Sequence, residues 1–268
     1  MNPSAIAREY IETGRCETCP IIDLHAHYGH FSGIYMPNHT PEQMLATMDR
    51  CGVKLAVSSG HTALADMALG NQEIAELTAE QAGRWYGYTV YNPNYPDLGQ
   101  RELALYASRR SMVGLKLHPS YHQCALSDPA YGPAYAFAAA NELIVLTHTW
   151  GESRYDAPKV LAQVAEANPR VTFLAGHSGF GEFDACIEVA RRLPNVYLEL
   201  TAAYRIGGLI QRMVERAGAH KIVFGCDLPW FDPHYAIGCV VMAHIGEQER
   251  RAILRENALK LLEGRKRV

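Results

Sequence analysis

The stretch Ile21-Ile22-Asp23-Leu24-His25-Ala26-His27 is an apolar run that ends in two histidines one residue apart. The apolar residues predict a buried β-strand, and alternate side chains of a strand share a face. His25 and His27 are therefore expected to project together from the end of this strand. Two neutral imidazoles in that arrangement can bind one divalent metal ion.

Three later apolar runs also end in a side chain that can bind a metal ion. These side chains are His148, His177 and Asp227. Imidazole and carboxylate groups suit zinc and other borderline divalent ions. Together with the first histidine pair they form one site only if the ends of their strands meet in space.

Apolar runs bounded by turn residues predict eight strands that alternate with segments of helical character. The strands are expected around residues 21–24, 54–58, 85–90, 113–117, 143–147, 171–175, 196–200 and 222–225. The helices are expected at residues 41–51, 72–81, 98–108, 135–141, 158–167, 183–193, 208–217, 235–244 and 248–262. The clearest helix start is Thr40 as N-cap followed by Pro41 in the first turn.

Strands that alternate with single helices imply parallel pairing through right-handed crossovers. Eight such units in about 250 residues predict an α/β protein with one (β/α)8 TIM barrel. We expect a single barrel domain at residues 20–268, preceded by an N-terminal extension at residues 1–19. A doubly wound open sheet is the alternative, but no G-x-G-x-x-G follows the first strand.

The composition is that of an ordinary globular protein, with 268 residues of which 48% are hydrophobic and 20% charged. A formal net charge of −3 gives no support to nucleic-acid binding. No uncharged run approaches the ~20 apolar residues that span a bilayer, and the N-terminus lacks the pattern of a secretory signal. We therefore expect neither a nucleic acid nor a membrane as partner. The basic ending Arg265-Lys266-Arg267 is interpreted as a solvated helix end.

The seven cysteines are scattered and odd in number, which is typical of a reducing compartment. The expected location is the cytoplasm. Cys16 and Cys19 form a single C-x-x-C, which supplies only half of a tetrahedral zinc site. We therefore do not expect a zinc or redox role for this pair.

On a closed barrel, strand-end residues that are far apart in sequence converge at one mouth. The expected metal ligands are His25, His27, His148 and Asp227. A zinc ion there would lower the pKa of a bound water toward ~7. Asp227 is expected to take the proton of the attacking water, while His177 polarises the substrate or completes a second metal site.

This ordered set, with Lys116 on the fourth strand, resembles the amidohydrolase superfamily of metal-dependent enzymes. Four segments are similar to its amidohydrolase-related subgroup: Ile22-Asp23-Leu24-His25-Ala26-His27, Gly114-Leu115-Lys116-Leu117-His118-Pro119, Phe224-Gly225-Cys226-Asp227-Leu228-Pro229 and Asn257-Ala258-Leu259-Lys260-Leu261-Leu262. The subgroup includes hydrolases, lactonases and decarboxylases similar to aminocarboxymuconate-semialdehyde decarboxylase. The resemblance extends from residue 20 to the C-terminus and does not specify a substrate.

The resemblance implies two versions of the metal site. In binuclear members a carboxylated fourth-strand lysine bridges two metals, whereas decarboxylase-like members hold one metal. We expect one divalent ion per chain, zinc in the first place with manganese as an alternative, and two ions only if Lys116 is carboxylated. In the mononuclear case Lys116 serves as a charged group toward the substrate. Similar proteins are often dimers, so a homodimer is left open.

Residues around the expected mouth have two open interpretations. Asp23 shares the face of His25 and is expected to orient an imidazole or Lys116. The residues that follow strands either contact the substrate or pack as ordinary loop residues. They are His61, His118, His122, Trp150, Tyr204, Trp230 and His234.

Three functions follow in order of preference. The first is a metal-dependent hydrolase of a small amide, cyclic amide, lactone or ester. The second is a nonoxidative decarboxylase, a carbon–carbon lyase, acting on an aromatic or unsaturated acid. The third is a barrel that binds metal or ligand without turnover. In all three the partner is a small molecule.

Overall fold

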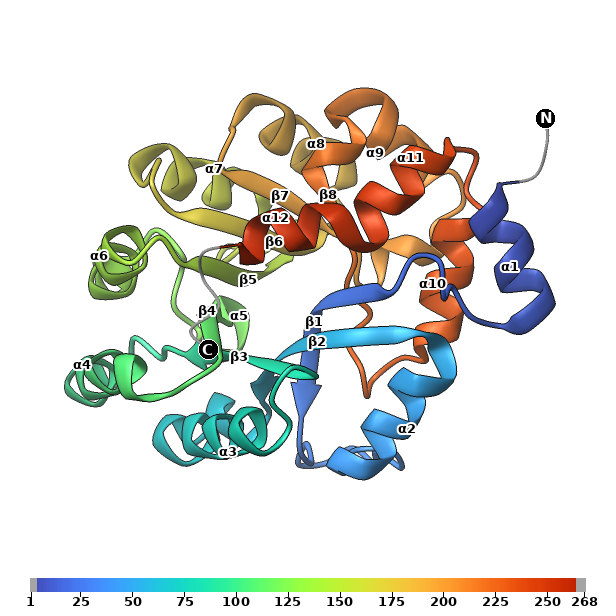
Figure 1. Cartoon of the computed structure of the whole chain (residues 1–268). Coiled ribbons are helices and arrows are strands. Elements are labelled where there is room, and N and C mark those ends of the chain that lie inside the picture. The colour runs from blue at the N-terminus through green and yellow to red at the C-terminus, as the bar shows by residue number, and fades with distance from the viewer. Residues whose placement is uncertain (1–3, 264–268) are drawn as a thin grey trace.

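The computed structural model describes residues 4–263 and confirms the predicted single-domain (β/α)8 TIM barrel. Eight strands pair in parallel in the order of the sequence, and helices surround them (Figure 1). The strands are β1 Ile21–Tyr28, β2 Val53–Gly60, β3 Trp85–Val90, β4 Met112–Leu117, β5 Ile144–Trp150, β6 Thr172–Phe180, β7 Val196–Glu199 and β8 Ile222–Val223. The basic ending at residues 265–267 lies outside the described residues.

The helices alternate with the strands as predicted. Two of them, α2 and α7, have the predicted bounds. They are α1 Ala5–Thr13, α2 Pro41–Cys51, α3 Met67–Glu80, α4 Pro96–Leu105, α5 Pro119–His122, α6 Gly132–Ala140, α7 Pro158–Ala167, α8 Phe183–Arg192, α9 Leu209–Ala217, α10 Pro233–Val241, α11 Glu247–Arg251 and α12 Asn257–Leu262. A π-helical turn, η6 (Ala252–Glu256), joins α11 to α12. The predicted N-cap of α2 is confirmed, since the Thr40 side chain accepts a hydrogen bond from the Gln43 amide.

The barrel closes between β1 and the segment that follows β8. The Leu24 amide donates to the Phe224 carbonyl at 3.0 Å, and the His27 amide donates to the Leu228 carbonyl at 2.7 Å. The Asp227 amide donates to the carbonyl of His25 at 2.7 Å. This closure seam brings β1 and the end of β8 together along their length.

Strand β8 is shorter than predicted, because it ends at Val223 and not at Gly225. The Phe224 amide donates to the Ile253 carbonyl of η6 at 3.1 Å, so it leaves the strand ladder. The segment after Phe224 instead pairs with β1, through the Asp227 amide and the Leu228 carbonyl.

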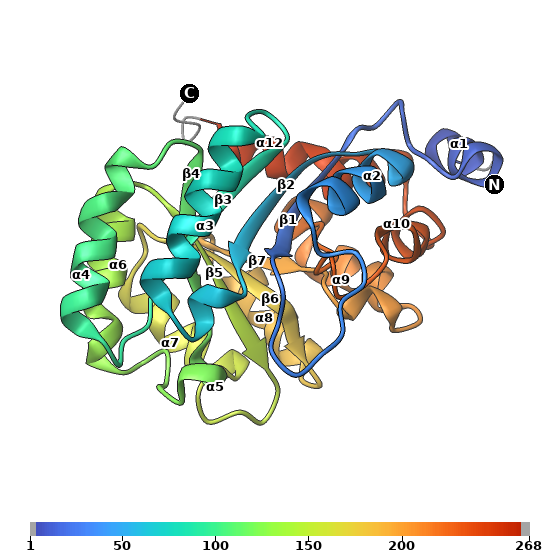
Figure 2. The same ribbon diagram turned by 90° about the horizontal axis from the view of Figure 1, so that it is seen from below.

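The barrel interior is filled by apolar side chains from the strands and is closed at its N-terminal end by α12. Val57, Leu146 and Leu174 belong to this inner cluster, which also includes Leu261 and Leu262 of α12. Helix α12 lies at the end where the strands begin (Figure 2). The opposite end stays open for a site.

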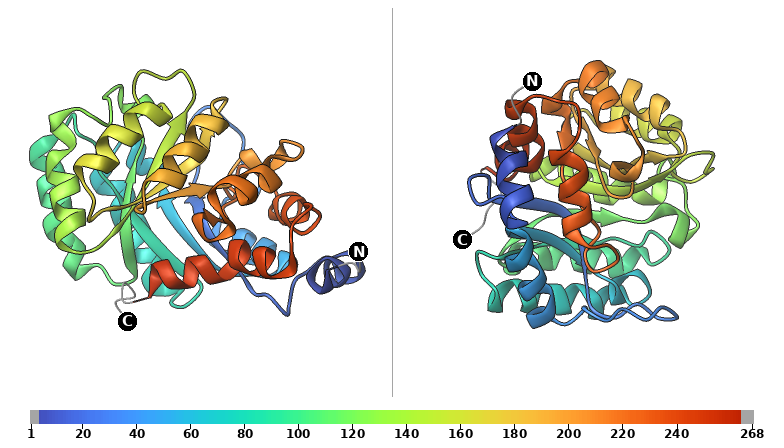
Figure 3. Two further views of the ribbon diagram at one scale, coloured as in Figure 1. Left: turned by 90° about the horizontal axis from the view of Figure 1, so that it is seen from above. Right: turned by 90° about the vertical axis from the view of Figure 1, so that its right-hand side faces the viewer.

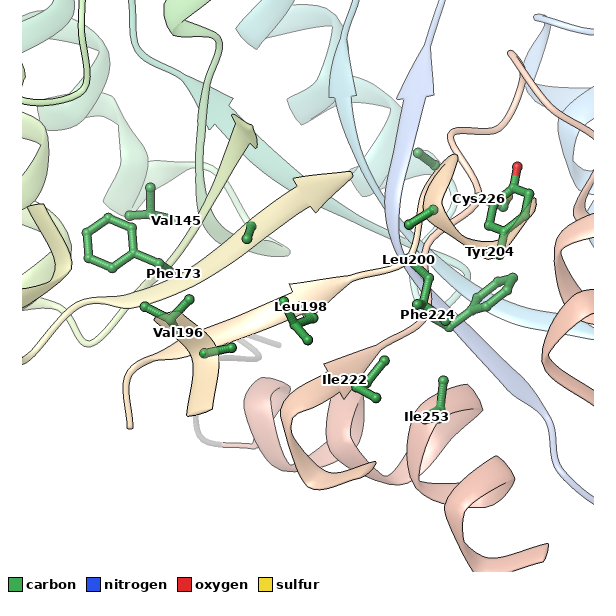
Figure 4. Close-up of a cluster of buried hydrophobic side chains, with 14 of the residues drawn as sticks. Val145, Phe173, Val196, Leu198, Leu200, Tyr204, Ile222, Phe224, Cys226 and Ile253 are labelled. Carbon is green, nitrogen blue, oxygen red and sulfur yellow. The ribbon is translucent and has the colours of Figure 1, made fainter. Parts of the chain in front are cut away.

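A second, larger core lies between the outer faces of the strands and the helices. Phe173, Leu198 and Ile222 project outward from β6, β7 and β8, and Ile253 of η6 packs over this part of the layer (Figure 4). Burial of such side chains stabilises the fold by about 25 cal/mol per Å² of apolar surface removed from water. This layer holds the strands in register and so fixes where their ends lie.

The expected extension at residues 1–19 contains α1, which the sequence analysis did not predict. Helix α1 packs beside α10 and α11 on the outside of the barrel (Figure 3). The Tyr10 hydroxyl donates to the His234 carbonyl at 2.6 Å. We propose that this segment is an extension docked on the barrel and not a separate domain.

Candidate metal centre at the barrel mouth

Three of the predicted ligands meet at the open end of the barrel. His27 Nε2 lies 3.0 Å from Asp227 Oδ1, and His25 Nε2 lies 3.5 Å from the same oxygen. One ligand atom from each of the three side chains lies within 4.8 Å of the others, and all three residues are buried. The closure seam creates this group, since it joins the backbone of Asp227 to that of His25.

The protonation of His25 is set by Glu199, the last residue of β7. Glu199 Oε2 lies 2.7 Å from His25 Nδ1, and both side chains are fully buried. Burial lowers the pKa of His25 well below its usual range, so the ring is neutral. The single hydrogen therefore sits on Nδ1, and Nε2 keeps its lone pair toward Asp227.

This donor set fits a divalent cation. Asp227 Oδ1 is buried and accepts no hydrogen bond within the described part of the chain. The unprotonated nitrogen of His25 lies 3.5 Å from that oxygen, and the Lys116 amine beside it supplies the positive charge that a bound divalent ion would replace. Nitrogen and oxygen ligands together suit zinc or manganese.

Lys116 lies at the end of β4 beside the same nitrogen. Its Nζ is 2.8 Å from His25 Nε2, and the side chain is almost completely buried. Burial lowers the pKa of Lys116 to about 8. The amine is therefore easily made neutral, which is a condition for carboxylation and also for releasing the imidazole to a metal.

His148 of β5 lies at the mouth but outside the three-residue group. Its Nδ1 lies 3.0 Å from Asp156 Oδ2, which leaves Nε2 for other contacts. Its ring stacks on His118 with centroids 4.4 Å apart, and its centroid is 4.7 Å from that of His177. His148 thus lies on the cavity wall next to His177.

His177 and Asp227 share an unusual backbone conformation. Both have φ of 65°, in the left-handed region that favours glycine. Each is held there by its own amide: that of His177 donates to Glu199 Oε2 at 3.1 Å, and that of Asp227 donates to the His25 carbonyl. Residues in such conformations cluster at functional sites, where the surroundings hold them in place.

The group opens into a cavity of about 310 Å³. Its polar wall includes Lys116, His148, His177 and Asp227. The aromatic wall is formed by Phe31, Tyr121, Trp150, Trp230 and Phe231, and the cation Arg205 lies beside it. A mostly apolar pocket with a few convergent polar groups is the usual form of a small-molecule site.

The family model described as "Amidohydrolase" matches residues 22–264 of the chain. The chain belongs to the amidohydrolase family. The resemblance to the amidohydrolase superfamily that the sequence indicated is therefore confirmed. No curated protein matches the chain in sequence.

Several solved structures have the same fold at low sequence identity. A TIM-barrel protein from Bordetella bronchiseptica is 18% identical, with a TM-score of 0.78 over 92% of this chain and 99% of that one. The 5-carboxyvanillate decarboxylase from Novosphingobium aromaticivorans, solved with manganese and 4-hydroxy-3-methoxy-5-nitrobenzoic acid, is 13% identical, with a TM-score of 0.72 over 91% and 96%. The 2,6-dihydroxybenzoate decarboxylase from Rhizobium is 17% identical, with a TM-score of 0.70 over 91% and 99%.

In this amidohydrolase-family barrel, only some of the residues expected around the mouth line the cavity. His61, His118, Trp150 and Trp230 line the cavity, and Trp230 Nε1 donates to His61 Nε2 at 2.8 Å. Other candidates lie elsewhere. His122 Nε2 contacts the Leu64 carbonyl, while Tyr204 and His234 are not part of the cavity wall.

Asp23 does not have the predicted role of orienting an imidazole or Lys116. Its Oδ1 accepts a hydrogen bond from the backbone amide of His25 at 2.9 Å, and its Oδ2 accepts one from the Cys226 thiol at 2.8 Å. Asp23 therefore holds β1 against the segment after β8. Glu199 orients the ring instead.

The sequence analysis missed Glu199 and Asp156, the two carboxylates that orient His25 and His148. A weak signal existed for Glu199, because it is the single acidic residue in the apolar run 196–200. A carboxylate in a buried strand needs a partner. Asp156 lies in a loop eight residues after His148 and carried no comparable signal.

Within the described residues, no helix is both long and apolar enough to cross a membrane.

Proposed function

We propose that this chain is a metal-dependent nonoxidative decarboxylase of a small aromatic carboxylic acid, the function placed second from the sequence. The observation that carries the proposal is the cavity, whose lining combines aromatic side chains, candidate metal ligands, and the basic side chains of Lys116 and Arg205. A volume of about 310 Å³ suits a substrate with one ring. Two structural neighbours named as decarboxylases of substituted benzoates support this choice.

We propose His25, His27, His148 and Asp227 as ligands of one divalent ion per chain, zinc or manganese. The mutual approach of His25, His27 and Asp227 supports three of them, and the free Nε2 of His148 supports the fourth. Such an ion, when bound, supplies positive charge for the carboxylate and a neighbouring hydroxyl of the substrate. Metal analysis with and without bicarbonate tests the number of ions per chain. If bicarbonate carboxylates Lys116, the number should rise from one to two.

The chain's own residues bind the acid in two ways. Trp150 and Trp230 line the cavity and supply apolar surface for the substrate ring. Arg205 forms no ion pair with a carboxylate among the described residues, and its guanidinium lies 5.1 Å from the centroid of Phe180. Arg205 is therefore available to an anionic substrate in the cavity.

Decarboxylation breaks the bond between the ring carbon and the carboxyl carbon, releases carbon dioxide and forms a carbon–hydrogen bond at the same ring carbon. The site must therefore deliver one proton. We assign its delivery to the Asp227 carboxyl group, which lines the cavity. General acid catalysis of this kind contributes about 10²–10⁴-fold in rate.

Hydrolysis of a small amide, lactone or ester is the second candidate. The observation that favours it is that Asp227 Oδ1 and His177 Nδ1 are both buried without a hydrogen-bond partner in the described residues, on the same cavity. Asp227 would take a proton from water and His177 would donate to the developing oxyanion.

A reaction in deuterium oxide separates the two candidates. The enzyme loaded with manganese or zinc is incubated with a panel of hydroxybenzoates, lactones and amides. A decarboxylase releases carbon dioxide and leaves one deuterium on the ring carbon that lost the carboxyl group. Cleavage of lactones or amides without carbon dioxide release would instead establish the hydrolase. Asp227→Asn should abolish turnover, and the exposed Asp184→Asn should leave it unchanged.

We propose the cytoplasm as the location, supported by the free state of all seven cysteines. The homodimer implied by the resemblance stays a prediction, which sedimentation analysis tests.

A further inference from the structure

A second group of metal-binding side chains lies outside the barrel, where α2 approaches the start of α10. Cys51 is the last residue of α2, Asp232 is the N-cap of α10, and His234 lies in the first turn of α10. One ligand atom from each lies within 4.8 Å of the others. We propose that these three side chains bind a divalent transition-metal ion, zinc in the first place, independently of the barrel mouth.

The imidazole of His234 is held in the tautomer that a metal needs. Its Nε2 lies 3.0 Å from the Gly14 carbonyl, which can only accept a hydrogen bond, so Nε2 carries the hydrogen. The lone pair therefore lies on Nδ1, which is 3.7 Å from Asp232 Oδ1. A backbone carbonyl that fixes the ring of a ligating histidine in this way is a common feature of metal sites.

The sulfur of Cys51 lies in surroundings that favour a thiolate once a cation is present. Its side chain is buried, and the nearby backbone amide of His234 donates to Asp232 Oδ1 at 2.8 Å. Cys51 thus lies beside the N-terminus of α10, a nine-residue helix whose dipole attracts negative charge. Without a metal, burial followed by the negative charge of Asp232 raises the pKa of Cys51 to about 11.

The ligand set identifies the class of ion. One sulfur, one nitrogen and one carboxylate oxygen suit zinc or cobalt, whereas magnesium and calcium prefer oxygen ligands. Three protein ligands leave a fourth position for water. The side chains of Asp232 and His234 are 58% and 31% exposed, so the ion can enter from solvent.

An ion at this position would connect three parts of the chain. The loop at residues 228–232 carries Trp230 and Phe231 of the cavity wall and ends at Asp232. The backbone of His234 binds Tyr10 of α1, and its ring binds Gly14. The ion would thus hold α2, the N-terminal segment and the end of this loop together.

Cobalt titration tests the site without reference to activity. The full chain is freed of metal by a chelator and titrated with Co²⁺, while the near-ultraviolet thiolate-to-cobalt charge-transfer band is recorded. The proposed ligands at the mouth contain no sulfur, so this band reports a cysteine ligand outside the mouth site, and the cysteine variants identify which one. We expect one equivalent of thiolate-bound cobalt per chain in the parent protein and in His27→Asn.

Variants then identify the ligands. Cys51→Ser should lose the band, whereas the matched control Cys239→Ser, on α10 itself, should keep it. His234→Gln should lower the apparent cobalt affinity at least tenfold, as read from the titration of the band. Absence of the band in the parent, or its persistence in Cys51→Ser or unchanged affinity in His234→Gln, would overturn the proposal. Neither result bears on decarboxylation.

Discussion

Single buried carboxylates decide the chemistry of the histidines at the mouth. Glu199 accepts hydrogen bonds from His25 Nδ1 at 2.7 Å and from the amides of His177 and Thr201 at 3.1 and 2.6 Å. Burial raises the pKa of Glu199 to about 7, while the hydrogen bonds from Thr201 and from the His177 amide oppose the rise. One side chain thus controls both the tautomer of a ligand and the strained backbone of His177.

Replacing Glu199 with glutamine should weaken metal binding at the mouth. Both oxygens of Glu199 accept hydrogen bonds, Oε2 from His25 Nδ1 and Oε1 from the Thr201 amide. Glutamine keeps the volume but has one oxygen, so its NH2 group must face one of these two donors, which weakens the hold on the His25 ring. We expect a loss of about 10–100-fold in metal affinity, measured by competition with a chelating dye. The control is Glu102→Gln, a buried carboxylate that binds Asn71 and Arg109 away from the mouth. Equal affinity in the Glu199→Gln variant and the parent would contradict the assignment.

His122 should make folding sensitive to acid. Burial lowers the pKa of His122 from 6.5 to about 4 in the folded chain. Between these values the unfolded chain binds the proton and the folded chain does not, so the free energy of unfolding falls as pH drops from about 6.5 to about 4. Each unit of pKa difference corresponds to about 1.4 kcal/mol.

Urea unfolding across this pH range measures the effect of His122. His122→Gln should have a shallower decline than the parent, whereas the exposed His220→Gln should follow the parent curve. Parallel curves for His122→Gln and the parent would show that His122 does not contribute.

At the scale of elements, the structure differs from the sequence prediction mainly at the ends. Helix α3 begins at Met67, five residues before the predicted start, and Asp66 caps it. Gly70 in its first turns is a poor helix former, but a Cβ there would lie 2.0 Å from the backbone nitrogen of Ala63. Close packing against Ala63 therefore requires glycine at position 70, and this glycine weakens the helical pattern at the start of α3.

Strands β5 and β6 extend beyond their predicted ends, to Trp150 and Phe180. Trp150 pairs with Phe180, so the pairing of β5 with β6 continues beyond the predicted strand ends. His148 and His177 consequently lie within strands and not after them. This gives both histidines the rigid support that a binding site needs.

Gly225, between β8 and Asp227, should not tolerate a side chain. A Cβ there would lie 2.1 Å from Glu199 Oε1 and 2.7 Å from His25 Cβ, inside van der Waals contact. Gly225→Ala should displace Glu199, lower metal affinity at the mouth by at least tenfold and destabilise the fold by about 1–3 kcal/mol. Metal titration and urea unfolding measure the two effects.

The matched control for this variant is Gly132→Ala, where a Cβ would meet nothing within 4 Å. Stability and metal affinity should stay close to those of the parent. If Gly225→Ala behaved in the same way, position 225 would not lie as close to Glu199 as the structure indicates.

At the scale of the molecule, the closure seam makes the metal centre part of the fold. The proposed ligands come from both sides of the seam, His25 and His27 from β1 and Asp227 from the segment after β8. An ion bound to all of them would add a link between the first and last strands of the barrel.

Removing the metal should therefore lower the melting temperature. An ion present at 100 times its Kd stabilises a fold by about 2.7 kcal/mol, or roughly 5–10 °C for a chain of this size. Calorimetry with and without chelator measures the shift. The Cys51→Ser background keeps any ion at the second site out of the comparison, and Asp227→Asn in that background should have a much smaller shift. An equal shift in both would place the stabilising ion elsewhere.

The sequence by itself determined the barrel and most of the proposed site. Alternating apolar runs and amphipathic segments depend on local spacing, which can be read along the chain. Parallel strands of a closed barrel end at one mouth, so His25, His27 and Asp227 could be predicted to meet although about 200 residues separate them.

Only the tertiary structure decided which groups control those residues. The pairing of His25 with Glu199, of His148 with Asp156, and of Asp23 with the backbone depends on the shear of the barrel and the paths of its loops. Sequence spacing contains no direct measure of these distances. Tautomers, pKa values and the aromatic cavity wall depend on neighbours in space, and for that reason they became visible only in the folded chain.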